Sequence, residues 1–476
     1  MDEIFLENFK ALCAIPHATH HEEAIGQYIL DRALAKGLKA HRDETGNVIM
    51  EREAAPGYEN APMTIMEAHM DMVAVAKPGS GWNPLTDAPI PVREGDMLRA
   101  ECSSLGGDDC SGVALIQELM EDESLLCGPL RGLITVDEEQ GMSGAKAMDP
   151  KELEGAYLIN LDWEESGRLC CASAGSERFT LRFAFPLHAY EGEGITLRLH
   201  GLTGGHSGTE IHKGRCNAIR GLCEMLNSMF DSGIPLRIAS LTGGNADNAI
   251  PCDATVTLSL PIGKTESFQC IILDKLEELK ERYKGIEQQM LLDMELCKVE
   301  KAWSFEDTER FLNCVCAMKL GANTMVAAIP GLVESSCNLG RAFFDENGST
   351  LSCMQRSCEP SVTEAMLAKY RRQAEACGAE MEVVSSTPPW PLKENSHLQK
   401  LCTEQYKALT GEEMELVSVH AGLETSCWVV KNPALDCVSI GPNIYDIHSP
   451  AETLDLKSCD LLHDLVVAML REIAKE

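Results

Sequence analysis

The chain has 476 residues and a formal net charge of −33, and 44% of its residues are hydrophobic while 24% are charged. This composition is typical of a soluble globular protein, and the length predicts two domains, because a single core rarely grows so large. The negative charge argues against nucleic acid and anionic membranes as partners, since both are polyanions.

The cysteines and the first residues indicate a reducing compartment. None of the 21 cysteines forms a Cys-x-x-Cys pair and many lie in apolar runs, so we interpret most of them as small buried side chains. The start, Met1-Asp-Glu-Ile-Phe5, lacks the basic and apolar regions of a signal peptide. No apolar stretch is long enough to span a bilayer. The cytoplasm is therefore the expected location.

An amphipathic helix is predicted over residues 2–15, and a second helix is predicted over residues 22–35. The turn between them holds His17, His20 and His21. Their spacing is irregular and no pattern of carboxylate ligands accompanies them. We therefore predict a solvated loop rather than a metal site at this turn.

Short apolar strands that end in acids or a histidine then recur along the chain. In open α/β sheets ligands bind beyond the carboxyl ends of the strands, so these side chains are expected to meet in one site. Histidines and carboxylates together are typical of a metal site with nitrogen and oxygen ligands. The strands are predicted at 63–66, 133–136, 158–161 and Cys437, and they lead to His69 and Asp71, to Glu138 and Glu139, to Asp162 and to His448.

Each of these side chains also has an ordinary structural explanation. Asp108 follows Leu105-Gly-Gly and precedes a helix predicted over 111–121, so it could cap that helix. Asp109 or Ser111 could do so equally well, which would leave Asp108 for a cation. Glu138-Glu139 could begin a helix, where acids are favourable, and His448 could be a turn histidine. The coincidence of several such strand ends favours the metal site.

The pattern of apolar and polar residues changes in the middle third of the chain. Phe179, Leu181, Phe183 and Phe185 alternate with polar residues, which predicts a half-exposed antiparallel strand. The following order of strand, helix, two strands and helix indicates a ferredoxin-like α+β unit. A similar order, including a strand over 324–329, suggests that this unit is doubled. The predicted division is a first domain over 1–183 and 385–476, with an insertion over 184–384.

The motifs together resemble those of M20-type metallopeptidases, most of all the aminoacyl-histidine dipeptidase (Xaa-His dipeptidase) group. The resemblance extends from about residue 5 to the end of the chain. It rests on the order His69-x-Asp71, Gly-Gly-Asp108, Glu138-Glu139, Asp162 and His448-Ser-Pro450, with Gly204-Gly-His206, Asn248-Ala-Ile-Pro251, His420-Ala-Gly-Leu-Glu424 and Ser439-Ile-Gly-Pro442 in addition.

This resemblance implies an α/β fold: a zinc-peptidase-like catalytic domain with a mixed central sheet flanked by helices, and an inserted α+β lid. It implies two Zn²⁺ ions, with Co²⁺ or Mn²⁺ as other divalent ions that could serve. His69 and Asp162 would hold one ion, Glu139 and His448 the other, and Asp108 both. Asp71 would orient His69 and Glu138 would be the general base, while His206, Asn248 and Arg356 would bind the substrate.

The implied function is hydrolysis of the peptide bond of unblocked dipeptides, of the Xaa-His type, by a homodimer that associates through the lid. Adjacent side chains of an extended chain point apart, so the backbone must twist if Glu138 and Glu139 are both to reach the site. The alternatives are an N-acyl amino-acid deacylase or a tripeptidase of the same architecture, and a metal-binding protein without activity. The glutamate at position 138 argues against the last of these.

Overall fold

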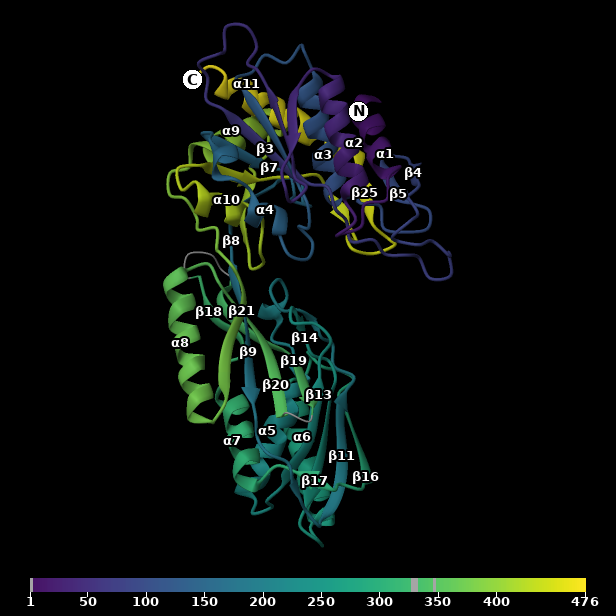
Figure 1. The fold of residues 1–476 in the computed structure, drawn as a ribbon, viewed down its shortest axis with the longest axis vertical. Coiled ribbons are helices and arrows are strands. Elements are labelled where there is room, and N and C mark those ends of the chain that lie inside the picture. The colour runs from purple at the N-terminus through teal and green to yellow at the C-terminus, as the bar shows by residue number, and fades with distance from the viewer. Residues whose placement is uncertain (1–2, 327–332, 346–347) are drawn as a thin grey trace. The chain divides into compact units, whose positions relative to one another are not determined.

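The computed structural model describes residues 3–326, 333–345 and 348–476 (Figure 1). The chain divides into two compact units, and each is described by itself. The first comprises Met1–Ala172, Trp390–Ser418 and Leu423–Glu476, and the second comprises Ser173–Pro389 with Val419–Gly422. The middle of the sequence is thus an insertion into the first unit.

The second unit extends beyond residues 184–384 at both ends. Strand β9 (Gly175–Phe183) pairs with β21 (Glu380–Thr387) in the sheet of this unit. A division at residues 183/184 and 384/385 separates β9 from its neighbours and cuts β21. The two strands are distant in sequence, so their pairing is not visible from local pattern.

The first unit is built on an eight-stranded mixed sheet in the order β1-β2-β6-β3-β7-β23-β8-β22. Strand β3 runs parallel to β6 and β7, and β23 runs parallel to β7, so the four central strands share one direction. The strands are β1 (Lys39–Arg42), β2 (Val48–Arg52), β3 (Thr64–His69), β6 (Leu130–Thr135), β7 (Tyr157–Asn160), β8 (Arg168–Ser173), β22 (Glu415–Val419) and β23 (Asp436–Ser439).

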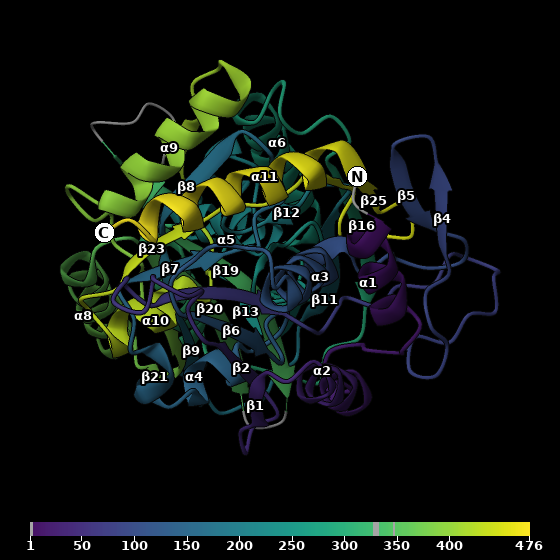
Figure 2. The same ribbon diagram turned by 90° about the horizontal axis from the view of Figure 1, so that it is seen from above.

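Helices cover both faces of this sheet, which agrees with the complete burial of β3 and β6. Figure 2 shows α9 and α11 on one side of β7 and β23 and α10 on the other. None of the described helices has the length and apolar composition needed to cross a membrane. The helices of this unit are α1 (Glu3–Cys13), α2 (Glu23–Ala35), α3 (Gly107–Glu121), α4 (Ser143–Ala147), α9 (His397–Thr410), α10 (Thr425–Lys431) and α11 (Leu456–Ile473).

A small antiparallel sheet joins two distant parts of the first unit. Its order is β24-β25-β5-β4, and Thr453 lies opposite Arg99 in it. The segment that follows β5 and the segment that precedes β25 are therefore neighbours. The strands are β4 (Pro91–Glu94), β5 (Met97–Ala100), β24 (Ile444–Tyr445) and β25 (Thr453–Asp455).

The turn of histidines between α1 and α2 is only partly solvated. His20 and His21 are exposed, but His17 is buried. The His17 ring lies 2.6 Å from the carbonyl oxygen of Ile15 through Nδ1, and its Nε2 lies 3.4 Å from Cys110 Sγ. The prediction of a solvated loop is thus wrong for His17, because this side chain packs against the start of α3.

The second unit has one nine-stranded sheet in the order β16-β11-β15-β13-β19-β20-β9-β21, with β18 also paired to β19. Strands from both halves of the predicted doubled insertion lie in this sheet. The two halves are joined where Gly243 of β13 pairs with Ala342 of β19. Of the strand predicted over 324–329, residues 327–329 lie outside the described residues. The further strands are β11 (Glu193–His200), β13 (Arg237–Gly243), β15 (Ala254–Leu260), β16 (Leu291–Cys297), β18 (Gly321–Met325), β19 (Val333–Asp345) and β20 (Gly348–Ser357), with two-residue strands β10 (His188–Ala189), β12 (Gly205–His206), β14 (Ala249–Ile250) and β17 (Lys301–Ala302).

In the described part of the second unit, α5, α7 and α8 contact this sheet and α6 packs on α5. Helix α5 contacts β11, β13, β15 and β19, and α8 contacts β9, β20 and β21. The alternation predicted in β9 is confirmed, since Phe179, Leu181 and Phe183 are buried. The helices are α5 (Ala218–Asp231), α6 (Thr265–Arg282), α7 (Phe305–Ala317) and α8 (Pro360–Ala376).

An aromatic cluster centred on Trp303 should contribute to the stability of the second unit. Trp303 is fully buried, and its ring centroid lies 5.3 Å from those of Phe185 and Phe311 and 5.1 Å from that of Phe344. We expect Trp303→Ala to lower the free energy of unfolding by about 3–5 kcal/mol, because it leaves a cavity. Denaturant unfolding measures this change, with exposed Phe343→Ala as the control. Equal losses in both variants would contradict the assignment of Trp303 to the core.

Candidate metal centre

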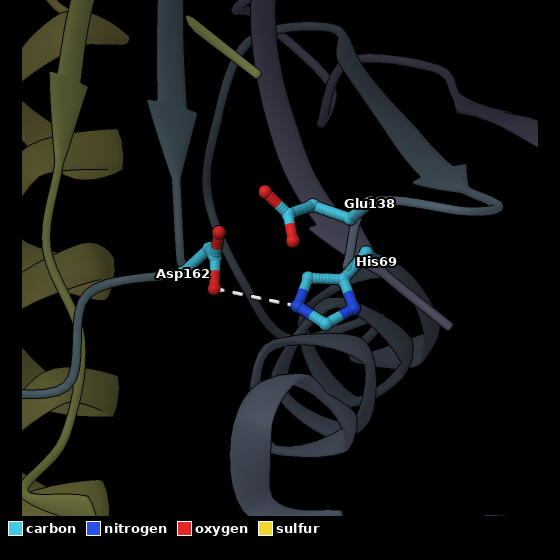
Figure 3. A group of neighbouring side chains, drawn as sticks. All are labelled: His69, Glu138 and Asp162. Atoms are coloured by element: carbon cyan, nitrogen blue, oxygen red, sulfur yellow. Dashed lines mark ion pairs between the residues drawn. The ribbon is translucent and has the colours of Figure 1, made fainter. Parts of the chain in front are cut away.

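The carboxyl ends of the central parallel strands place acids and a histidine at one edge of the sheet. His69 is the last residue of β3, Glu138 lies in the turn after β6, and Asp162 follows β7. Figure 3 shows that all three side chains point into one space. They form a group in which one ligand atom from each lies within 4.8 Å of the others. The expected meeting of these strand ends is thus present in the fold.

The His69 ring faces two carboxylates. Its Nε2 lies 3.0 Å from Asp108 Oδ1 and 3.4 Å from Asp162 Oδ1, and the second contact is the dashed line of Figure 3. Asp108 lies at the start of α3, where the backbone is not yet helical. The helix N–H group of Gly112 donates to Asp109 Oδ1 at 2.9 Å. Asp109 therefore does the capping, and the Asp108 carboxylate is left to face His69.

His448 reaches the same aspartate from the opposite end of the chain. Its Nε2 lies 3.2 Å from Asp108 Oδ2 and 3.0 Å from Glu139 Oε2. Asp108 thus presents one oxygen to His69 and the other to His448. The Asp108 carboxylate is thus shared by two imidazole groups. The His69 ring also contacts Asp162, and the His448 ring also contacts Glu139.

Asp71 supports both His69 and the turn after β6. The Nδ1 atom of His69 lies 3.0 Å from the backbone oxygen of Asp71 and 3.5 Å from its carboxylate. The backbone N–H groups of Glu138 and Glu139 donate to that carboxylate at 3.0 and 3.4 Å. Asp137, with φ of 56°, supplies the backbone twist expected before these two glutamates.

Burial and mutual repulsion shift the titration of these groups. Burial raises the pKa of Glu138 well above its usual range, and neighbouring Glu139 raises it further although His69 lowers it. Burial and Asp108 also raise the pKa of Glu139. Burial alone would lower the pKa of His448, but Asp108 and Glu139 raise it to about 11. The carboxylates of the site therefore stabilise positive charge on groups close to them.

The donor set fits a pair of divalent cations. The nitrogen and oxygen donors of His69, Asp108 and Glu139 form one potential metal group, and those of His69, Glu138 and Asp162 form another. Imidazole and carboxylate donors suit Zn²⁺. Buried carboxylates in excess of cationic side chains are unfavourable unless further positive charge compensates them. The residues present thus meet the requirement of a metal centre.

Two acidic residues near this group were not singled out from the sequence. Glu164 forms a third potential metal group with Asp108 and Asp162, and burial raises its pKa to about 7. Its position two residues after Asp162 is the only sequence signal that could have identified it. Glu452 is buried and accepts hydrogen bonds from the loop that carries Asp108. No local pattern marks Glu452.

The residues expected to bind substrate all lie in the second unit. His206 belongs to β12, which pairs with β14 so that His206 lies opposite Ala249, beside Asn248. A Cβ atom at Gly208 would lie 3.0 Å from His206 Cε1 and 3.2 Å from Arg356 Nε. The second unit therefore brings His206, Asn248 and Arg356 to one region. His420 joins them, since its backbone oxygen would lie 2.3 Å from the same Cβ.

The local hydrogen bonds fix how His206 can act. The backbone N–H groups of Gly208 and Thr209 donate to its Nδ1 at 3.3 and 3.0 Å. Because Nδ1 accepts these bonds, the neutral ring carries its proton on Nε2. Arg356 is buried, its Nε has no hydrogen-bond partner among the described residues, and burial lowers its pKa to about 10. A buried guanidinium in this state favours an incoming anion.

Known proteins resemble this chain over nearly its whole length. Residues 65–472 match peptidase family M20/M25/M40. The chain is 31% identical over 469 residues to the cytosol non-specific dipeptidase of Escherichia coli strain K12, covering 98% of this chain and 96% of that protein. The expected resemblance to M20-type peptidases is thereby confirmed.

Solved structures agree with the sequence comparison. The aminoacylhistidine dipeptidase of Vibrio alginolyticus is similar with a TM-score of 0.87 and 31% identity, covering 99% of this chain and 96% of that one. A tripeptidase from Staphylococcus aureus has a TM-score of 0.57 at 16% identity, covering 100% of this chain and 99% of that one, which shows a shared fold alone. The mixed α/β architecture with an inserted α+β unit is therefore the fold predicted from the sequence.

Proposed function

The chain belongs to peptidase family M20/M25/M40 and is a hydrolase acting on peptide bonds, and on this premise we propose that it is a dipeptidase for unblocked dipeptides of the Xaa-His type. The observation that carries the proposal is the Asp108 carboxylate, with its two oxygens directed at His69 and His448. A carboxylate shared in this way suits a hydrolytic centre of two closely spaced metal ions. The aminoacylhistidine dipeptidase from Vibrio alginolyticus supports the substrate class.

In this proposal the centre holds two Zn²⁺ ions, for which Co²⁺ or Mn²⁺ could substitute. His69 and Asp162 would hold one ion, Glu139 and His448 would hold the other, and Asp108 would serve both. When bound, such ions lower the pKa of a water molecule and polarise the scissile carbonyl group. The contacts of His69 with Asp108 and Asp162, and of His448 with Asp108 and Glu139, support this division.

The residues of the chain then move the proton. The Glu138 carboxylate accepts a proton from the attacking water and delivers it to the nitrogen of the leaving amine. The raised pKa of Glu138, which burial causes, suits a group that must hold this proton. Asp71 orients the His69 ring and accepts hydrogen bonds from the backbone N–H groups of Glu138 and Glu139. It therefore fixes the position of the proposed base, Glu138, relative to the proposed metal ligand His69.

We assign the second unit the role of a lid that binds the substrate, with its core in residues 184–384. His206 donates from Nε2 to the oxyanion of the tetrahedral intermediate. Asn248 and Arg356 bind the carbonyl group or the C-terminal carboxylate of the dipeptide. The Nε atom of buried Arg356, which has no partner in the part of the chain that the structure describes, supports this role. The proposed assembly is a homodimer through this lid, and the proposed location is the cytoplasm, where the Escherichia coli relative is named to act.

The charge of the centre favours a free amine on the substrate. Asp71, Asp108, Glu138, Glu139, Asp162 and Glu164 give the centre an excess of carboxyl groups over cationic side chains. A protonated α-amino group compensates this excess, whereas an acylated nitrogen does not. We therefore favour dipeptides over N-acyl amino acids.

A substrate panel with the zinc-loaded protein tests the proposal. We expect Ala-His to be cleaved with a kcat/KM about 10–100-fold above that of N-acetyl-histidine, because a lost charged hydrogen bond costs about this much. Ala-Ala-His and Ala-Ala should also react more slowly than Ala-His. A chelator should abolish hydrolysis and added zinc should restore it.

Each other result of the substrate panel would support a different function or specificity. Faster hydrolysis of N-acetyl-histidine would indicate a deacylase, and faster hydrolysis of Ala-Ala-His would indicate a tripeptidase. Equal rates on Ala-His and Ala-Ala would contradict the preference for histidine. Bound zinc without any hydrolysis would indicate a metal-binding protein that lacks activity.

A further inference from the structure

A single buried carboxylate, Glu452, holds the loop from which Asp108 projects. It is 3% exposed and directly precedes β25. The N–H groups of Leu105 and Gly106 donate to its Oε2 at 2.7 and 3.0 Å. Those of Gly107 and Asp108 donate to its Oε1 at 2.7 and 3.4 Å. One side chain therefore accepts from four consecutive backbone N–H groups.

These N–H groups have few other ways to be satisfied. The first N–H groups of a helix have no partner within it, and they usually bond to a nearby side chain. Gly106, which directly precedes α3 and its non-helical first residues, has no side chain to offer and has φ of 76°. A Cβ atom at Gly107 would lie 3.2 Å from Glu452 Oε1. The two glycines thus allow the backbone to wrap closely around a carboxylate supplied from the distant end of the chain.

Glu452 also belongs to the segment that carries His448. The N–H group of Glu452 donates to the carbonyl oxygen of Ser449 at 3.1 Å, which closes the turn between them. Strand β25 then pairs with β5, so the segments of Glu452 and Asp108 are anchored to one small sheet. The carboxylate is therefore a direct connection between the loop of Asp108 and the loop of His448.

We propose that Glu452 is a positioning residue that places the Asp108 carboxylate between His69 and His448 for binding of the metal pair. This inference rests on the proposed two-metal centre and extends it. Glu452 touches neither substrate nor metal in this role, and acts through the backbone of Asp108. Loss of a partner that orients a metal ligand typically costs about 10–100-fold in metal affinity.

The test is the zinc affinity of Glu452→Gln, measured by competition with a chromophoric chelator. Glutamine keeps the shape but replaces one acceptor oxygen with an amide that turns its hydrogens towards backbone N–H groups. We expect zinc affinity to fall about 10–100-fold, and Glu452→Asp, which keeps the charge, to recover part of it. The melting temperature of the metal-free variants is measured in parallel, because a purely structural role would change stability without changing affinity.

Glu287→Gln is the matched control. This buried glutamate of the second unit accepts hydrogen bonds from the N–H groups of Thr203 and Cys216 at 2.7 and 3.0 Å. It should lose stability with unchanged zinc affinity. Wild-type zinc affinity in Glu452→Gln would overturn the proposal.

Gly107→Ala decides the question if Glu452→Gln does not fold. The added methyl group would lie 3.2 Å from Glu452 Oε1 and displace the carboxylate without removing it. Reduced zinc affinity in this variant would support the proposal, and unchanged affinity in both Gly107→Ala and Glu452→Asp would overturn it. Zinc binding is measured independently of hydrolysis, so a protein that binds zinc and cleaves no dipeptide would contradict only the proposed substrate.

Discussion

Glu138→Gln is expected to abolish peptide hydrolysis while leaving the bound metal unchanged. Glutamine has nearly the same shape but cannot accept the proton of the attacking water. Transfer of this proton by a positioned side chain typically contributes about 10²–10⁴-fold to the rate, and kcat should fall by this factor. The backbone N–H of Glu138 donates to Asp71, so the turn itself should be preserved.

Two measurements on the same protein check this expectation. Elemental analysis after dialysis should find wild-type zinc content, and kcat on Ala-His should show the loss. Glu165→Gln is the control, because Glu165 is solvent-exposed and pairs with Arg168. Activity near wild type in Glu138→Gln would remove this residue from the mechanism. Loss of zinc would instead make Glu138 a ligand, a role that its position near His69 and Asp162 also permits.

The positions of His69, Glu138 and Asp162 could be predicted because their signals are local. Each follows a short apolar run, and strands β3 and β6 are buried on both faces, as continuous apolar runs predict. The parallel direction of these strands then brings their ends together. A pattern of a few residues thus determines where these side chains lie.

Other features depend on contacts between distant segments and left no local pattern. Glu452 meets the loop of Asp108 across 344 to 347 residues of sequence. The pairing of β9 with β21 sets both ends of the second unit and joins segments about as distant as its whole length. His17 looked like a loop residue, yet it is buried against Cys110 of α3. Such contacts follow from tertiary packing, which local spacing does not record.

The choice between Asp108 and Asp109 also needed the structure. Both aspartates stand at the start of a helix, and either is chemically suited to cap it. The bond from the Gly112 N–H to Asp109 assigns that task, and the contacts of Asp108 with His69 and His448 distinguish the two. Sequence therefore identified the pair of candidates, and backbone geometry separated them.

Asp108→Asn is expected to abolish both metal binding and activity, in contrast to Glu138→Gln. Asp108 lies 3.0 Å from His69 Nε2 through one oxygen and 3.2 Å from His448 Nε2 through the other. Asparagine replaces one of these oxygens with an amide donor and removes the negative charge, so it cannot serve two cations. The loss of zinc affinity should exceed the about 10–100-fold that follows from removing a residue that only orients a ligand.

Zinc titration of the metal-free variant checks this expectation, with Asp464→Asn on the exposed face of α11 as the control. Two zinc ions bound at wild-type affinity would contradict the shared role of Asp108. One ion retained and one lost would show that Asp108 holds a single metal. The proposed mechanism then predicts a loss of hydrolysis, because it would use both ions to activate water and polarise the carbonyl group. The pair of variants therefore separates the two proposed tasks of the centre: Glu138→Gln should remove the proton acceptor and keep the bound metal, and Asp108→Asn should remove the metal and keep the proton acceptor.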